Sequence, residues 1–267
     1  MDRMDLNRYR ERIRNRFSKA SSTYDESAIA QRTIAHTLSE MLKDYLAHNA
    51  SRFPRNGLEI GCGTGLLTRY LQALCPSAHW VLNDIQETGK ERALSYCADD
   101  TEFICQDAES LDVKGHFSLI ASASTFQWFI HPDKMIERFA RWQSAGNILL
   151  FSTFLPDNLR EIRQLTGIGL SYPSSEDWRH WLERDYLIRH QKEEQLTLCF
   201  DTPMQVLLHM KHTGVTGTHA GVWSAGKLRA FCEAYTRHYR TSENQVTLTY
   251  RPLYVLAEKN KRACVAP

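Results

Sequence analysis

Apolar residues recur along the chain with two different spacings. Within residues 1–50 they follow the period of an amphipathic helix, whose buried face would carry Ile34, Leu38, Met41, Leu42 and Tyr45. After residue 56, short apolar runs alternate with helical segments, and the runs are GLEI, HWVLNDI, TEFICQD, FSLIAS and NILLFST. Continuously apolar strands that alternate with helices are typical of a parallel sheet with both faces covered. The pattern therefore predicts an α/β fold, in which ligands bind beyond the carboxyl ends of the strands.

The alternation of strands and helices loosens after Phe154. Helix starts are expected at three places, a capping box at Ser174 and Asp177, Thr202 followed by Pro203, and Ser224. Strands are expected at 195–200 and within the alternating segment 245–258. Helices inserted between two late strands would overhang the ligand edge of the sheet, so we interpret this insertion as a lid.

The chain is accordingly divided into four parts. Residues 1–50 are expected to form a helical cap, and residues 51–200 the ligand-binding α/β core. Residues 201–244 would be the helical lid insertion. Residues 245–267 would supply one or two terminal strands that complete the core sheet, followed by a tail.

A glycine-rich turn joins the first predicted strand to its helix, with the sequence Glu59-Ile60-Gly61-Cys62-Gly63-Thr64-Gly65. Three glycines in five residues let the backbone approach a ligand closely, and the start of the helix adds N–H donors. The dinucleotide fingerprint G-x-G-x-x-G is not matched, because Leu66 stands where its third glycine belongs. The phosphate-loop pattern fails as well, because no G-K-[ST] follows. Cys62 is interpreted as a small residue that fills the loop rather than as a nucleophile.

Two acidic residues follow at the ends of the next two strands. Asp84 ends the second strand, nineteen residues after Gly65, and Asp107 ends the third, followed by Ala108-Glu109. A carboxylate at Asp84 can accept hydrogen bonds from both hydroxyls of a ribose. The alternative is that both acids are helix caps or turn residues.

The pattern E-x-G-x-G-x-G, followed by these two acids in order, resembles class I S-adenosylmethionine-dependent methyltransferases. The resemblance implies a Rossmann-like, seven-stranded, mostly parallel sheet with helices on both faces. It also implies that the loop contacts the amino-acid part of S-adenosylmethionine, that Asp84 binds the ribose and that Asp107 accepts from the adenine amino group. The cofactor-binding residues so implied are Glu59, Gly61, Cys62, Gly63, Gly65, Asp84, Ile85, Asp107, Ala108 and Ser122.

Composition narrows the class of protein further. The chain has 267 residues and a formal net charge of +2, which argues against a nucleic-acid-binding protein. Its seven cysteines form no C-x-x-C pair, as expected for reduced thiols. The N-terminal residues lack the apolar core of a signal peptide, and no apolar stretch approaches the ~18 residues of a membrane span. We therefore predict a cytoplasmic protein without a membrane partner.

The chain shows neither an evident general base nor a metal-binding motif. The D/N-P-P-Y/F motif of amino-group methylation is missing. His209, His212 and His219 lie close in sequence, but no Cys or acid accompanies them at ligand spacing, so we interpret them as lid or surface histidines. A carboxylate acceptor is already ionised at pH 7, because its pKa is ~4, and would need no base. We therefore expect no catalytic residue and no metal, and a reaction that proceeds by positioning alone.

Several short segments resemble the malonyl-[acyl-carrier-protein] O-methyltransferases of biotin synthesis. They are Arg16-Phe17 to Tyr24-Asp25, Gln31, Ser122 to Gln127-Trp128, Lys211-x-x-Gly214, Thr216-Gly217-Thr218-His219 and Leu248-Thr249-Tyr250. The resemblance implies methylation of the free carboxylate of a malonyl thioester on acyl-carrier protein, giving an ester that primes synthesis of the pimeloyl precursor. Tyr24, Gln127, Trp128 and Lys211 would then bind the acceptor. For each of them a structural role is the alternative, in the core for Tyr24, in packing for Trp128 and in solvent for Lys211.

Other interpretations remain open at this stage. The seven Lys and Arg residues within the first twenty would either steer an acidic carrier protein or form a solvated helix face. The acceptor thioester could be carried on acyl-carrier protein or on coenzyme A. Alternatively, the chain methylates another small molecule at oxygen, carbon or nitrogen, reduces a substrate with a nicotinamide, or binds the cofactor without catalysis. The missing third glycine and the absence of any Tyr-x-x-x-Lys pair argue against the reductase.

Overall fold

The computed structural model describes residues 9–11, 14–15, 24–214 and 223–261. The chain divides into two compact units. The first, here called the sheet unit, comprises Gln31–Leu155, Pro173–Glu193 and Pro252–Pro267. The other, here called the second unit, comprises Met1–Ala30, Pro156–Tyr172 and Glu194–Arg251. Neither unit is a continuous segment, because the chain passes from one to the other several times.

A seven-stranded sheet forms the centre of the sheet unit, with strand order β3-β2-β1-β4-β5-β9-β6. The five strands from β3 to β5 are parallel, and β9 runs antiparallel to both of its neighbours. The Rossmann-like, mostly parallel sheet predicted from the sequence is therefore confirmed. The strands are β1 (Asn56–Ile60), β2 (His79–Asp84), β3 (Glu102–Cys105), β4 (Leu119–Ser122), β5 (Ile148–Phe154), β6 (Tyr186–Glu193) and β9 (Pro252–Lys259).

The strand order places a ligand site at one particular edge. From β1 the chain adds β2 and β3 on one side and then returns to place β4 on the other side. The order reverses between β1 and β4, and the carboxyl ends of such a pair bound the crevice in which ligands of open α/β sheets bind. The glycine-rich turn follows β1 directly, so it lies at this crevice.

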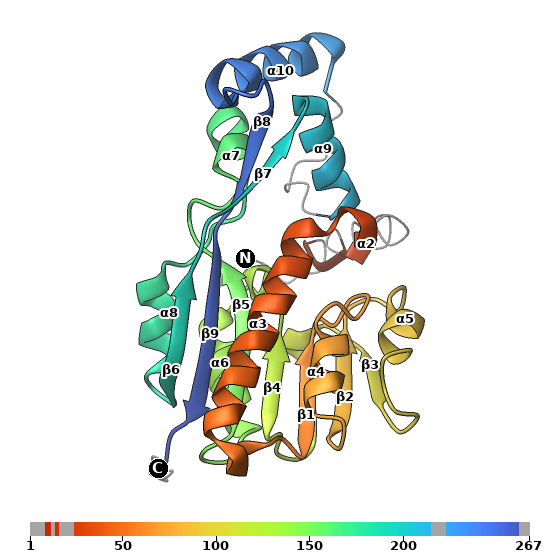
Figure 1. Cartoon of the computed structure of the whole chain (residues 1–267), viewed down its shortest axis with the longest axis vertical. Coiled ribbons are helices and arrows are strands. Elements are labelled where there is room, and N and C mark those ends of the chain that lie inside the picture. The colour runs from red at the N-terminus through yellow and green to blue at the C-terminus, as the bar shows by residue number, and fades with distance from the viewer. Residues whose placement is uncertain (1–8, 12–13, 16–23, 215–222, 262–267) are drawn as a thin grey trace. The chain divides into compact units, whose positions relative to one another are not determined.

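Helices cover both faces of the sheet, with α3 and α4 on one face and α6 on the other (Figure 1). The predicted apolar face of α3 is confirmed, because Ile34, Leu38 and Leu42 are fully buried. The capping box of Ser174 and Asp177 is also confirmed at the start of α8. The helices of this unit are α3 (Ile29–His48), η1 (Ala50–Arg52), α4 (Thr68–Leu74), α5 (Lys90–Leu94), η2 (Ala108–Ser110), η3 (Phe126–Trp128), α6 (Pro132–Arg141) and α8 (Ser175–Leu182).

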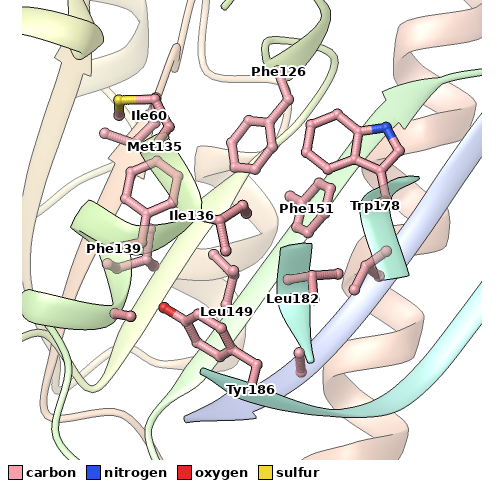
Figure 2. Packing of buried hydrophobic residues seen from close by; sticks show 14 of the residues in the cluster. Ile60, Phe126, Met135, Ile136, Phe139, Leu149, Phe151, Trp178, Leu182 and Tyr186 are labelled. Carbon is pink, nitrogen blue, oxygen red and sulfur yellow. The ribbon is translucent and has the colours of Figure 1, made fainter. Parts of the chain in front are cut away.

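An aromatic cluster packs between the sheet and the helices α6 and α8 (Figure 2). The ring of Phe126 lies 4.4 Å from that of Phe151 on β5 and 5.5 Å from that of Phe139 on α6, measured between centroids. The ring of Trp178 on α8 lies close to the rings of both Phe126 and Phe151, at 5.9 Å from Phe126. Phe126 is the first residue of η3, so the core holds in place the turn that carries Gln127 and Trp128.

The second unit combines a two-stranded antiparallel sheet with short helices. Its elements are α2 (Tyr24–Ser27), α7 (Arg160–Thr166), β7 (Leu196–Phe200), α9 (Pro203–His212), α10 (Ala225–Tyr239) and β8 (Val246–Tyr250). The helix starts predicted at Thr202 and Ser224 are confirmed, because each hydroxyl accepts a backbone N–H one turn later. The carboxylate of Glu161 is buried in this unit, where it accepts from the N–H and the hydroxyl of Thr249.

The ends of the sheet differ from the sequence-based expectation. Residues 245–267 were expected to supply one or two strands to the core sheet; one of them, β9, joins it, whereas β8 pairs with β7 in the separate sheet. The strand predicted at 195–200 is β7 and belongs to the second unit. The seventh strand of the main sheet is instead β6, which the sequence pattern does not reveal. Its burial alternates poorly, because β6 is an edge strand whose side chains are mostly exposed.

Strands β6 and β7 pair with β9 and β8 in one common register. Glu193 pairs with Leu253, and three residues further on Leu196 pairs with Tyr250. The same register runs from His190 to Phe200, after a single irregularity between Ile188 and His190. The two strand pairs belong to separate sheets, and residues 201–245 connect β7 to β8.

Some predicted residues cannot be placed. Thr216, Gly217, Thr218 and His219 lie outside the described residues, as do most of the basic residues among the first twenty. In the described part of the chain, no helix is both long and apolar enough to cross a membrane.

Candidate functional site

The three loop glycines all adopt backbone conformations that other residues avoid. Their φ angles are +68° at Gly61, +54° at Gly63 and +86° at Gly65. A Cβ atom on Gly61 would lie 2.2 Å from Oγ1 of Thr125, so this glycine lets the turn after β4 pack against the turn after β1. A Cβ on Gly63 would meet no described atom within 4 Å, which leaves this face of the loop open to a ligand.

Asn83, a buried amide that sequence analysis did not single out, holds the loop in place. Its carbonyl accepts the N–H groups of Gly61 and Cys62 at 2.8 and 3.0 Å. Its side-chain amide donates to the carbonyls of Ile104 and Gln106 at 3.0 and 2.8 Å. One residue therefore joins the carboxyl ends of β1, β2 and β3. The only signal in the sequence is an amide inside the apolar run HWVLNDI.

The first predicted acid lies directly against the loop. Oδ2 of Asp84 accepts the N–H of Gly63 at 2.8 Å, and its Oδ1 accepts the N–H of Gln86 at 2.9 Å. Burial raises the pKa of this carboxyl above its ordinary value, and the backbone N–H bonds oppose that rise. The structure thus brings together the loop and the acid that the sequence predicted to act together.

Glu59 lies behind the loop and is almost fully buried. Its Oε2 accepts the hydroxyl of Thr68 on α4 at 2.7 Å, which ties β1 to the helix that follows the loop. Burial raises the pKa of Glu59 to about 8, the nearby Asp84 adds to the rise, and the Thr68 hydrogen bond opposes it. In this structure Glu59 therefore positions the loop, and its predicted contact with a cofactor stays a prediction.

The second predicted acid ends the neighbouring strand. Oδ1 of Asp107 accepts the N–H of Glu109 at 2.9 Å and so caps η2. The N–H of Gln106 donates to the carbonyl of Asp84 at 2.9 Å, which keeps the two strand ends adjacent. The side chain of Glu109 joins this segment to the one that precedes α6, because its Oε1 accepts the N–H groups of Ile130 and His131. Asp107 thus acts as a helix cap, which was the alternative to cofactor binding. It also lies near the end of β3, where the resemblance requires an acid that accepts from the adenine amino group.

The remaining cofactor candidates differ in exposure. Cys62 is buried against Leu82, and burial raises the pKa of its thiol well above the ordinary value, as suits a residue that fills space. Ser122 is fully buried and its hydroxyl donates to the carbonyl of Ile60 at 2.8 Å. Ala108 is buried in the aromatic core, whereas Ile85 is partly exposed next to Asp84.

A second turn of the site follows β4 and includes a non-glycine residue with positive φ. Ser124 has φ +55°, and its N–H donates to Oγ of Ser152 on β5 at 3.0 Å. The side-chain amide of Gln127 donates back to the Ser124 carbonyl. Gln127 and Trp128 are both partly exposed at the carboxyl end of β4, where the sequence predicted an acceptor site.

The other two acceptor candidates belong to the second unit. Tyr24 is the first residue of α2, and Lys211 is an exposed residue in the last turn of α9. Gly214, from the same Lys-x-x-Gly segment, has φ +70° and ends that helix. Tyr24 and Lys211 remain predictions as acceptor-binding residues.

The two described histidines of the predicted group bond to different partners. Nε2 of His209 lies 2.9 Å from the hydroxyl of Tyr250, and Nδ1 of His212 lies 3.4 Å from Oγ of Ser27. Burial lowers the pKa of His209 to about 4. Among the described residues, no three His, Cys, Asp or Glu side chains are grouped to hold a metal ion.

The loop and its acids fit the adenosyl cofactor implied by the resemblance. The open face of Gly63 provides room for a ligand against the backbone, and the Asp84 carboxylate offers oxygen acceptors beside it. Gly89 contributes a further close approach that sequence analysis missed, because a Cβ there would lie 2.1 Å from the Gly63 carbonyl oxygen. Its only sequence signal is a glycine shortly after Asp84.

Comparisons with known proteins identify the family of the chain. Residues 58–146 match a family model described as a methyltransferase domain. A malonyl-[acyl-carrier protein] O-methyltransferase of Porphyromonas gingivalis is 39% identical over 250 residues, covering 93% of this chain and 95% of that protein. One of Haemophilus influenzae is 37% identical, covering 92% and 93%. One of Bacteroides fragilis is 40% identical over 92% of this chain, which spans 50% of that longer protein.

Solved structures share the fold at low sequence identity. The YcgJ protein of Bacillus subtilis has a TM-score of 0.62 at 15% identity, covering 85% of this chain and 99% of that one. The plantazolicin methyltransferase BpumL, solved in complex with S-adenosylhomocysteine, has a TM-score of 0.56 at 16% identity, covering 97% of each chain. At these identities the likeness shows the fold alone.

Proposed function

The chain belongs to the malonyl-[acyl-carrier protein] O-methyltransferase family, and from that premise we propose that it methylates the free carboxylate of a malonyl thioester on acyl-carrier protein. It is an S-adenosylmethionine-dependent methyltransferase. The observation that carries the proposal is sequence identity: more than a third of the aligned residues are identical to those of two such relatives, along nearly the whole of each chain. The product would be a methyl ester, whose masked charge lets the acyl chain be elongated like an ordinary apolar primer.

The cofactor site is proposed for the loop and the two acids of the sheet unit. When bound, S-adenosylmethionine supplies an electrophilic methyl group on a sulfonium ion. The open backbone at Gly63 would receive its amino-acid part, Asp84 its ribose hydroxyls and Asp107 its adenine amino group. Glu59, Asn83 and Thr125 would not contact the cofactor but would position the loop. Their contacts hold the loop after β1 against β2, α4 and the turn after β4.

The acceptor carboxylate needs orientation rather than activation. A carboxylate is ionised at neutral pH and carries the lone pair that forms the new bond, so no proton has to be removed. Gln127 and Trp128 lie at the carboxyl end of β4 and are proposed to form one wall of this acceptor site. We further propose that Lys211 pairs with the carboxylate, that Tyr24 contributes from α2 and that residues 201–244 act as a lid.

The role proposed for Lys211 is tested by Lys211→Met. Removing an exposed cation that pairs with the substrate is expected to raise KM for the malonyl substrate about fivefold, corresponding to ~1 kcal/mol, with kcat retained. Lys134→Met removes an equally exposed lysine of the sheet unit and is the matched control. Steady-state kinetics that do not distinguish the two variants would reject the role.

The proposed reaction is tested with a radiolabelled methyl donor and three acceptors side by side, malonyl-carrier protein, malonyl-coenzyme A and free malonate. We expect label in the malonyl-carrier protein, and we expect mild base to release it as methanol because the product is an ester. A base-stable product would instead show methylation at carbon or nitrogen. The absence of label from every malonyl acceptor, in a protein shown to bind S-adenosylhomocysteine, would contradict the proposal.

A further inference from the structure

Helix α10 presents a row of basic side chains on its outer face. Arg229, Glu233 and Arg237 follow one another at helical spacing and are exposed, and the exposed Arg240 comes directly after the helix ends at Tyr239. The one acid in this row is already paired, because Oε1 of Glu233 accepts from Nε of Arg229 at 2.9 Å. Arg237 and Arg240 have no ion pair within the described part of the chain.

The opposite face of α10 is fixed to its own unit, so the basic row is held toward solvent. Phe231 and Tyr235 are buried, and the hydroxyl of Tyr235 donates to the carbonyl of Thr247 on β8 at 2.7 Å. The hydroxyl of Tyr239 donates to Oε1 of Gln164 on α7. These bonds prevent α10 from turning its arginines inward.

The adjoining helix α7 extends the same positive surface. Arg160 and Arg163 are exposed on α7, which lies beside α10 in the second unit (Figure 1). Arg160 is close enough to the end of α10 to act electrostatically on the hydroxyl of Tyr239. The acid on α7, Glu161, is fully buried and bonded to Thr249, and its Oε1 also lies 3.9 Å from Nε of Arg160. Arg160 is therefore partly neutralised, and Arg163 contributes more of the positive charge on α7.

We propose that this surface, formed by Arg160, Arg163, Arg229, Arg237 and Arg240, is the docking site for an acidic protein, namely the carrier protein of the proposed function, on which this inference rests. Concentrated positive charge on a rigid helix attracts an acidic partner and raises the rate of encounter. The aromatic residues Phe231 and Tyr235 of α10 are buried, which disfavours a membrane surface as the occupant. The net charge of only +2 disfavours a nucleic acid.

The test reverses two charges in the intact protein with Arg237→Glu/Arg240→Glu. We expect KM for malonyl-carrier protein to rise about tenfold or more and its salt dependence to weaken, because steering contributes ~10- to 1,000-fold to encounter rates. KM for malonyl-coenzyme A and the affinity for S-adenosylhomocysteine should stay unchanged. Lys114→Glu/Arg141→Glu makes the same change in net charge at exposed residues of the sheet unit and should leave every parameter unchanged.

The readouts separate failure of this inference from failure of the proposed function. Unchanged KM for the carrier-bound substrate in the α10 variant would overturn the docking site while leaving the reaction intact. If the wild-type protein methylates no malonyl acceptor, fluorescence anisotropy of labelled carrier protein still tests docking. Binding that the α10 variant loses would support the site, and equal binding would overturn it. Variant-sensitive binding of a DNA duplex but not of carrier protein would also overturn it.

Discussion

At the scale of single residues, the site depends on backbone conformations that only glycine adopts without cost. Gly61 and Gly63 turn the chain away from β1 so that successive N–H groups point to Asn83 and Asp84. The positions of Asp84 and the loop therefore depend on each other, because the Asp84 carboxylate accepts the N–H of Gly63, the residue proposed to contact the ligand.

Gly61→Ala is predicted to weaken binding of S-adenosylhomocysteine about tenfold or more, because left-handed backbone costs a non-glycine residue ~1–2 kcal/mol. The added Cβ also displaces Thr125, which it would approach to 2.2 Å. The matched control is Gly167→Ala, which has the same φ of +68° but no described atom within 4 Å of the added Cβ. Isothermal titration calorimetry gives the affinities. A similar loss of affinity in both variants would show that the contact with Thr125 is unimportant.

Glu59 is predicted to make the stability of the protein fall as the pH rises. Its pKa in the folded protein is about 8, above the ordinary 4.5. Between these values the unfolded chain loses the proton that the folded protein keeps, so the stabilisation is complete below about pH 4.5 and is lost as the pH rises toward 8.

Urea unfolding of the wild type and Glu59→Gln between pH 5 and pH 8 tests this. The variant cannot titrate and can still accept from Thr68. We expect the free energy of unfolding of the wild type to fall relative to the variant by at most ~1.4 kcal/mol per pH unit, the value for one proton. Parallel pH profiles of the two proteins would contradict the raised pKa.

At the scale of elements, the sequence predicted best where hydrophobic spacing and caps agree. The five parallel strands lie within mostly apolar runs, and the starts of α8, α9 and α10 carry side-chain caps, so each of these elements was predictable. Strand β6 was not, because Tyr186–Glu193 is an edge strand with mostly polar, exposed side chains. The pairing of β7 with β8 was not predictable either, because their apolar residues fit a strand in any sheet.

The candidate site shows the same division between local and nonlocal information. The glycine loop, Asp84 and Asp107 are recognised from their own positions in the sequence. Asn83 and Thr125 are recognised only from contacts with residues distant in sequence, Ile104 and Gly61. Their residue types are common in turns and strand ends, so no local signal marks them.

The aromatic core beneath η3 is predicted to support the acceptor side of the site. Phe126→Ala removes a ring in contact with Phe139, Phe151 and Trp178 (Figure 2), which should lower the free energy of unfolding by ~3–5 kcal/mol. Because Phe126 starts η3, KM for the acceptor should rise more than the dissociation constant for S-adenosylhomocysteine. Phe103→Ala, at a partly buried ring beside the cofactor loop, is the comparison. If Phe126→Ala raised only the dissociation constant for S-adenosylhomocysteine and not KM for the acceptor, the prediction would be wrong.

At the scale of the whole molecule, the described cofactor candidates all lie in the sheet unit, whereas Tyr24, Lys211 and the arginine surface lie in the second unit. Binding of the cofactor is therefore expected to stabilise the sheet unit, whereas binding of the carrier-bound acceptor is expected to stabilise the second unit as well. The division of labour has a direct thermodynamic signature, because a ligand stabilises only the structure to which it binds.

Hydrogen exchange measures this division. S-adenosylhomocysteine at about 100 times its dissociation constant should slow exchange in β1, β2 and the loop by up to ~2.7 kcal/mol in opening free energy. Exchange in α7 and α10 should change little until carrier protein is added. Equal protection of both units by S-adenosylhomocysteine alone would show that they respond as one.

The antiparallel register of β7 and β8 also constrains the order of folding. Contact between Phe200 and Val246 closes a connection that α9 and α10 shorten by forming locally. Each further rung then closes only a slightly longer loop and costs little additional chain entropy. We expect the pair to form from this end toward Leu196 and Tyr250. Strand β8 would thus align with β7 without a search for its partner across the length of the chain.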